Sequence, residues 1–170
     1  MKINIRKGVF ETNSSSTHSI MIQVNGPEKP ERWTLEEGLD QLRAMGVTIV
    51  DDRNLWGTIS LNFGTMDLEL AEFHRTEEAY NNWGMKLLYA IVSFLGSKFL
   101  WSGLLGYLKA KHIRSVILPQ EYDEYDPNGG GFGAIDHDSV GALGRIFSHG
   151  ISFEDYLERK DIYLVIDNEG

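Results

Sequence analysis

The run from Met85 to Leu95 constrains the fold more than any other stretch of this sequence. It is apolar nearly all round a helix, which is the pattern of a central, buried helix. The helical pattern begins at Thr76, with acidic residues such as Glu78 favourably placed near its N-terminus. Residues 99–108 predict a second apolar helix. A membrane span is the competing interpretation, but Gly96–Lys98 interrupts the apolar run well short of the roughly 20 residues that a span needs.

Short segments with strand character lie at both ends of the chain and in its middle. Most alternate apolar and polar residues, which is typical of a half-buried strand, and the last is apolar enough to be internal to a sheet. The strands are expected at residues 2–6, 20–24, 47–50, 58–63, 114–118 and 162–166. Strands separated by helices predict a single α+β (mixed α/β) domain, with a mixed sheet and the two apolar helices packed on one of its faces.

Two capping patterns predict further helices. Thr34-Leu35-Glu36-Glu37 has the form of a capping box, and the helix that follows is expected to end near Gly46. Ser152-Phe153-Glu154-Asp155 has the same form, and a helix is also expected after Ser139 through Leu143 and Phe147. These helices place amphipathic segments between the predicted strands.

The amino-acid composition limits the classes to which this protein can belong. The 170 residues suit one compact domain, 1–170, and the apolar content of 42% is that of an ordinary soluble globular protein. The chain has no cysteine, which excludes disulfides and thiolate metal sites and favours a reducing cytoplasm. No cleavable signal sequence is visible at the start. The net charge of −9 argues against a broad nucleic-acid-binding surface, but leaves room for a local cationic pocket or for docking on a basic partner.

A dense polar stretch, Phe10–Ser19, lies between the first two predicted strands. Its hydroxyl, amide, carboxylate and imidazole groups offer hydrogen bonds in several directions, which suits a site for a polar ligand. The candidate ligand-binding residues are Glu11, Asn13, Ser14, Ser15, Ser16, Thr17 and Ser19, with the ionisable His18 among them. The alternative is a serine-rich turn whose hydroxyls cap its own backbone.

The segment Ile5–Ser19 resembles the opening of a family of small proteins from phage and prophage genomes. Members typically begin with a strand, continue with VFETNSSSSHS and return to a strand. Their C-terminal third resembles GYIDHQS, a helix and an ILIxDNDN-like ending, which here correspond to Gly133–Ser139 and Ile162–Glu169. This chain departs from the pattern at Asp138 and Glu169, while the middle of the chain matches only loosely. The resemblance implies a phage origin and a shared polar site, and it supplies no reaction.

Two histidines lie in polar surroundings, His18 and His137. A pair of imidazoles can divide acid and base duties near neutral pH, which is what metal-independent phosphodiester cleavage needs. Asp136 would orient His137, while Ser139 and the hydroxyls of the first stretch would bind phosphoryl oxygens. Each histidine has a structural alternative as a strand-end residue bonded to backbone. The Asp-His-Asp cluster offers too few ligands to predict a metal site, and no cofactor is predicted.

Other polar residues are weaker candidates. Asp167 and Asn168 follow the last predicted strand, whose carboxyl end would face a ligand if that strand were parallel and central. The alternative is a turn at a frayed terminus. A structural role is expected for His74, His112 and His149, which lie in helical or helix-end contexts.

An acidic, aromatic segment followed by three glycines predicts a mobile loop at about residues 120–133. A solvated surface loop is the simpler interpretation. The sharper one is a mimic of a phosphate backbone that docks on a basic groove. The partner-binding residues would then be Glu121, Asp123, Glu124 and Asp126.

The sequence therefore supports two hypotheses of different classes. The first is a phage counter-defence protein that binds or cleaves RNA or a nucleotide signal in the host cytoplasm, through residues 11–19 and 136–139. The second is a non-enzymatic acidic inhibitor that blocks a host defence nuclease. A third possibility is that the serine-rich stretch is a structural plug in a protein-interaction module. No membrane association is expected.

Overall fold

The computed structural model describes residues 3–7, 17–24, 30–66, 78–80, 82–94, 98–118, 143, 147 and 150–169. The elements run in the order β1 (Ile3–Lys7), β2 (Thr17–Val24), α1 (Leu35–Ala44), β3 (Thr48–Asp51), β4 (Ile59–Asn62), a 3-10 turn (Phe63–Thr65), β5 (Glu78–Tyr80), α2 (Trp83–Phe94), α3 (Lys98–Ala110), β6 (Ile113–Ile117), α5 (Phe153–Glu158) and β7 (Ile162–Glu169).

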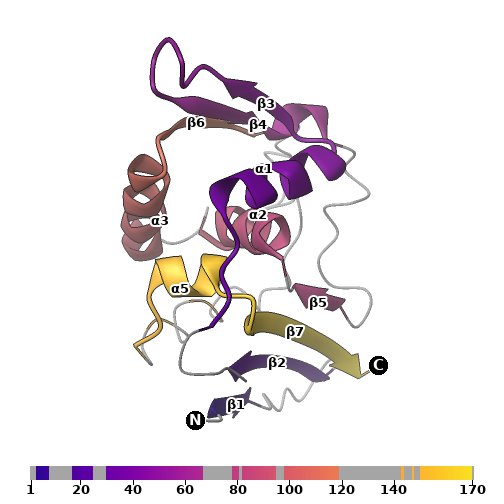
Figure 1. The fold of residues 1–170 in the computed structure, drawn as a ribbon. Coiled ribbons are helices and arrows are strands. Elements are labelled where there is room, and N and C mark those ends of the chain that lie inside the picture. The colour runs from indigo at the N-terminus through magenta and orange to yellow at the C-terminus, as the bar shows by residue number, and fades with distance from the viewer. Residues whose placement is uncertain are drawn as a thin grey trace.

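The strands form two sheets, and the helices lie between them (Figure 1). One sheet has the order β1-β2-β7-β5, and each of its pairs is antiparallel. The other has the order β3-β4-β6 and is mixed, because β4 pairs antiparallel with β3 and parallel with β6. The predicted α+β class with a mixed sheet is confirmed, and the second, antiparallel sheet is an addition to it.

Helix α2 is the centre of the core, as the apolar run predicts. It contacts α1, α3 and α5, and its residues 87–91 are buried. Helix α2 ends at Phe94 and α3 begins at Lys98, so the apolar region forms two helices as predicted, while Gly96 itself lies outside the described residues. Burying residues 87–91 between three other helices removes a large apolar surface from water, and such burial is the dominant favourable term in folding.

Helix α1 begins with the predicted capping box. The Thr34 side chain accepts a hydrogen bond from the Glu37 backbone amide, while the Glu37 carboxylate accepts one of 2.7 Å from the Thr34 amide. The bond from the Thr34 amide, together with one from the Thr34 hydroxyl, lowers the pKa of the Glu37 carboxyl group. Leu39 and Leu42 are fully buried, and Gly46 follows the helix with a φ of 90°. The α5 cap at Ser152 is also present, because its hydroxyl accepts from the Asp155 amide at 2.9 Å.

Strand β4 shows the expected period of two. Ile59 and Leu61 are fully buried, as is Phe63 just beyond the strand, while Ser60 and Asn62 are partly exposed. This buried face packs toward the helices, and α3 leads directly into β6 through His112. His112 has a φ of 61°, and its carbonyl accepts a hydrogen bond of 2.9 Å from the Ile59 amide.

Two local predictions are wrong. The helical pattern from Thr76 is interrupted by β5, which contains Glu78, and α2 begins only at Trp83. The strand predicted at residues 20–24 begins three residues earlier, at Thr17, so the end of the polar stretch through Ser19 belongs to β2. In both places an antiparallel partner completes the backbone hydrogen bonds, and this pairing overrides the local preference.

Candidate functional site

The β2–β7 ladder holds the part of the predicted polar site that the structure describes. His18 pairs with Asn168, Ser19 with Asp167 and Thr17 with Glu169. Residues opposite one another in an antiparallel pair have Cα atoms about 4.5–5.5 Å apart. The end of the N-terminal polar stretch therefore lies beside the C-terminal Asp-Asn pair, although some 150 residues separate them in the chain.

The prediction that Asp167 and Asn168 follow the last strand is wrong. They lie inside β7, which extends to Glu169, and do not follow the strand. β7 is central in its sheet, between β2 and β5, but it is antiparallel to both. The rule for ligand sites at the carboxyl ends of parallel strands does not apply to it. Their place opposite Ser19 and His18 is a different and more specific reason to consider them.

The other predicted site residues lie outside the described part of the chain. This holds for the remaining first-stretch residues, for the second histidine motif and for the acidic segment in the predicted loop at 120–133. They are Glu11, Asn13, Ser14, Ser15 and Ser16; Asp136, His137 and Ser139; and Glu121, Asp123, Glu124 and Asp126. The meeting of His18 with His137, which the catalytic hypothesis requires, stays a prediction. His74 and His149 lie outside as well.

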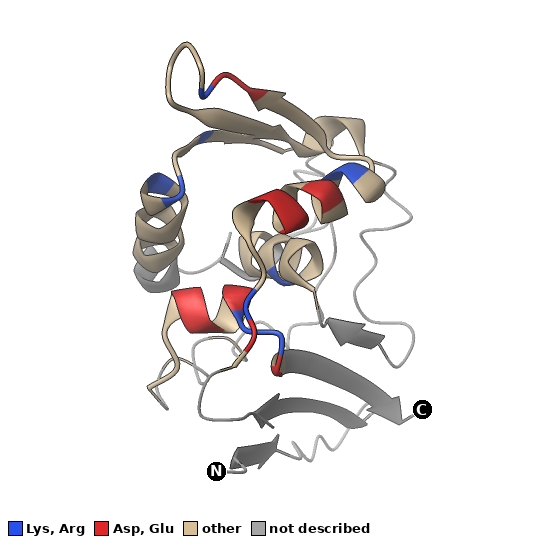
Figure 2. Cartoon of the chain, in the orientation of Figure 1, with Lys and Arg blue, Asp and Glu red and all other residues tan. Residues whose placement is uncertain are grey.

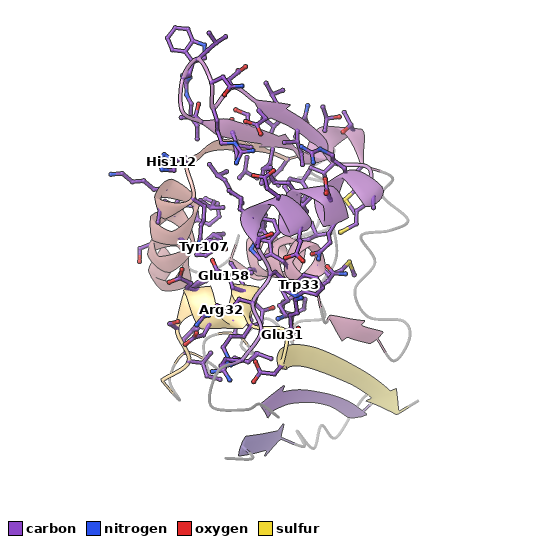
Figure 3. The ribbon with its side chains drawn as sticks, viewed as in Figure 1. Glu31, Arg32, Trp33, Tyr107, His112 and Glu158 are labelled. Atoms are coloured by element: carbon purple, nitrogen blue, oxygen red, sulfur yellow. The ribbon has the colours of Figure 1, made fainter. Side chains whose placement is uncertain are left out.

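A second polar group, at the junction of α2, α3 and α5, was not predicted. The Trp83 indole N–H donates a 2.8 Å hydrogen bond to the Tyr107 hydroxyl, which in turn donates to the Glu158 carboxylate at 3.2 Å. Figure 3 shows Tyr107 and Glu158 close together between α3 and α5. Burial raises the pKa of Tyr107, so its phenol keeps its proton and remains a donor. We refer to Trp83, Tyr107 and Glu158 as the junction network.

Two cationic side chains form ion pairs with the Glu158 carboxylate of the junction network. Lys111 forms an ion pair with Glu158 and a second, of 3.2 Å, with Glu154. Arg32 reaches Glu158 at 3.5 Å and also pairs with Asp155. The Trp33 amide donates to the Glu158 carbonyl at 2.7 Å, which joins the chain before α1 to the end of α5. Through these pairs, the Glu158 carboxylate connects α5 to the end of α3 and to the segment before α1.

Lys86 is a fully buried lysine on α2. Its ammonium donates a hydrogen bond of 2.8 Å to the Arg159 carbonyl and lies 5.9 Å from the centre of the Tyr156 ring. Burial lowers the pKa of Lys86 to about 7; the Asp161 charge opposes this effect, and the Arg159 charge adds to it. An amine of this kind is chemically able to act as a base, but a side chain with no exposed surface is not presented to a ligand.

The junction network and Lys86 are therefore structural features of the helical layer. The sequence contains one signal that could have indicated them, because Lys86 is a lone charge inside the apolar run from Met85 to Leu95. No comparable signal marked Glu158, whose partners lie 47 to 126 positions away in the chain. Within the residues that the structure describes, no cluster of three or more His, Asp or Glu side chains is arranged to hold a metal ion.

Comparisons of this chain with known proteins found no relative. No family model, no curated protein and no solved structure matches it. In the described part of the chain, no helix has both the length and the apolar character needed to cross a membrane.

Proposed function

We propose that the protein binds or cleaves a phosphodiester, either RNA or a nucleotide signal, at a polar site beside the β2–β7 ladder. The observation that carries the proposal is the pairing of His18 with Asn168 and of Ser19 with Asp167. It puts parts of two segments from the family resemblance, Ile5–Ser19 and Ile162–Glu169, on neighbouring strands of one sheet.

The chemistry of the proposed site follows from its residue types. An imidazole titrates near neutral pH and can transfer a proton, while hydroxyls and amides donate hydrogen bonds to phosphoryl oxygens. In this proposal His18 and His137 divide the acid and base roles, and Asp136 orients His137. Serines 14–16, Thr17, Ser19 and Ser139 bind the phosphoryl oxygens, while Glu11 and Asn13 position a ribose or a base edge. Asn168 adds an amide on the other strand.

The biological setting of the proposal comes from the resemblance alone. A phage protein of this kind would act in the host cytoplasm against a nucleic-acid-based defence. The net charge of −9 is compatible with a small substrate in a local pocket, whereas a broad nucleic-acid surface would be basic.

The test incubates the purified protein with labelled RNA and with a panel of cyclic and linear nucleotides, with and without a chelator. The His18→Ala, His137→Ala double variant is compared with His112→Asn. The control is suitable because His112 is exposed and has a φ of 61°, which asparagine tolerates. Turnover or binding that survives chelator, fails in the double variant and persists in the control supports the proposal. Equal activity in all three proteins contradicts the catalytic form, and neither binding nor turnover by any protein contradicts both forms.

The alternative function is a non-enzymatic inhibitor whose acidic loop blocks the basic groove of a host nuclease. It depends on Glu121, Asp123, Glu124 and Asp126 and leaves both histidines dispensable. Its signature is binding to the nuclease that weakens as salt rises, because salt screens exposed charges. Charge-neutral variants of the four acids would abolish that binding.

A further inference from the structure

Lys86 and Glu158 are the two charged side chains buried in the described part of the chain. Glu158 forms ion pairs with Lys111 and Arg32, whereas no carboxylate among the described residues forms an ion pair with Lys86. The Lys86 ammonium has three N–H groups, and it donates one hydrogen bond, of 2.8 Å, to the Arg159 carbonyl. A buried charge without a charged partner is costly, so the folded structure disfavours the protonated form of this lysine.

The two charged groups that act most on Lys86 are paired with each other. The Arg159 guanidinium donates to the Asp161 carboxylate at 3.0 Å and 2.6 Å. This pairing lowers the pKa of Asp161, which therefore stays ionised, and its charge only partly offsets the effect of burial on the pKa of Lys86. The other ionisable groups described on the helices around α2 are exposed or bonded elsewhere: Glu36, Glu37, Asp40 and Arg43 on α1; Tyr107, Lys109 and Lys111 on α3; and Glu154, Asp155 and Glu158 on α5.

The Lys86 ammonium lies against the turn between α5 and β7, residues 159–161. These three residues are half-buried, whereas Leu157 before them and Ile162 after them are buried. The carbonyl that accepts the Lys86 hydrogen bond therefore belongs to a residue that lies partly at the surface. Because of this position, displacing the turn alone would bring water to the ammonium.

Backbone hydrogen bonds to the segment before α1 hold the turn closed. The Lys160 amide donates to the Glu31 carbonyl at 2.9 Å, and the Trp33 amide donates to the last carbonyl of α5 at 2.7 Å. Between these bonds, Arg32 and Arg159 form an isolated antiparallel bridge outside the named strands. Figure 3 shows the segment before α1 beside α5, and Figure 2 shows acidic and basic residues gathered where this segment meets the turn. A bridge of one residue pair near the surface opens at a lower free energy than a core strand or helix.

We propose that residues 159–161 open locally when Lys86 takes up a proton, which makes this turn a pH-dependent switch between the helical layer and β7. The neutral amine suits the closed turn, and the ammonium is hydrated once the turn opens. Burial lowers the pKa of Lys86 to about 7 in the closed form, whereas in the open form it returns toward the ordinary 10.5. The open form therefore binds more protons between these values, so opening is favoured as the pH falls and levels off below pH 7. The switch does not depend on the proposed function.

Amide hydrogen exchange of the whole chain, followed by NMR from pH 9 to pH 6, tests the switch. The Lys160 and Trp33 amides report the turn, and the Leu61 and Ile91 amides in the core report global unfolding. Exchange rates corrected for the intrinsic effect of pH give the opening constant, which is the ratio of open to closed molecules. We expect the turn amides to have the larger opening constant at every pH. It should rise by about tenfold per pH unit as the pH falls from 9, and the rise should level off near pH 7.

Two variants assign the proton to Lys86. Lys86→Met has a side chain of similar length without the amine, so its turn amides should exchange with an opening constant that is independent of pH. Lys160→Met is the matched control, because it removes an ammonium from the same turn, one that lies 4.4 Å from the centre of the Trp33 ring. The opening constant of this control is expected to keep the wild-type dependence on pH.

Three results would overturn the switch. Equal opening constants for the turn and the core amides would show that the turn opens only when the whole chain unfolds. An opening constant of the turn that does not vary with pH in the wild type, or that still varies in Lys86→Met, would remove Lys86 from the mechanism. The comparison of turn with core amides uses the wild type alone, so it decides the proposal even where a variant does not fold.

Discussion

The Tyr107 hydroxyl donates a buried hydrogen bond of 3.2 Å to Glu158 while it accepts one of 2.8 Å from Trp83. One phenol thus joins α2, α3 and α5. Tyr107→Phe would leave the Trp83 N–H buried without its acceptor, which costs about 1–3 kcal/mol. Urea denaturation should show a lower free energy of unfolding by that amount, with an unchanged slope against urea. A change within about 0.5 kcal/mol, as for an ordinary surface substitution, would contradict the role given to this hydroxyl.

Lys86 makes the stability of the protein depend on pH in a defined direction. Its pKa of about 7 in the folded chain lies below the ordinary value of 10.5, so the unfolded chain binds more protons between these pH values. Stability therefore rises with pH across this window, by at most about 1.4 kcal/mol per pH unit from this group. Below pH 7 the cost of burying the ammonium is fully present.

Lys86→Met removes that titration and keeps a side chain of similar length. The difference in unfolding free energy between the wild type and Lys86→Met should shift in favour of the wild type as the pH rises from 7 to 10. Parallel urea titrations at several pH values measure this difference, since the other titrating groups cancel. A difference that stays constant with pH would show that Lys86 has an ordinary pKa.

Gly38 allows α1 to approach α2 closely. A Cβ atom at Gly38 would lie 2.4 Å from Cε3 of the buried Trp83 ring, whereas one at Gly106 on α3 would meet nothing within 4 Å. Gly38→Ala is expected to lower the free energy of unfolding by about 1–3 kcal/mol through overpacking. Gly106→Ala, the matched control, should raise it by about 0.5–1 kcal/mol because alanine favours the helix. Equal effects of the two substitutions would contradict this close approach.

Local sequence signals predicted the local structure well. The capping box at Thr34, the buried α2 run and the alternation of Ile59, Leu61 and Phe63 all depend on neighbours within one turn or one strand, and all are confirmed. Strand β5 was missed because Glu78 suits a helix N-terminus, while its strand state depends on Ile166, which pairs with it from the far end of the chain. Long-range pairing of this kind leaves no mark in a local pattern.

The candidate site was likewise predicted where local residue types mark it and missed where it depends on long-range pairing. Residue types alone marked His18 and Ser19, but only the strand register places Asn168 and Asp167 beside them. Nor does periodicity reveal which strands share a sheet, so one mixed sheet was expected where two sheets form. The junction network was missed for the same reason, since Glu158 and Tyr107 meet across 51 positions of chain.

Residues near the two ends of the chain pair at His18 and Asn168, and engineered cysteines provide a direct test of this pairing. The chain has no cysteine of its own, so a His18→Cys, Asn168→Cys pair can form only one intramolecular disulfide. Cα atoms that face one another across an antiparallel pair lie within the range that a disulfide spans. The control pair, His18→Cys with Val165→Cys, is three positions out of register, because Val165 pairs with Met21.

Mass spectrometry after mild oxidation of dilute protein measures the cross-link. The β2–β7 register predicts rapid and nearly complete formation of the 18–168 disulfide, with little or none between positions 18 and 165. Equal cross-linking of the two pairs, or failure of the 18–168 pair, would contradict the register and with it the site on which the proposed function rests.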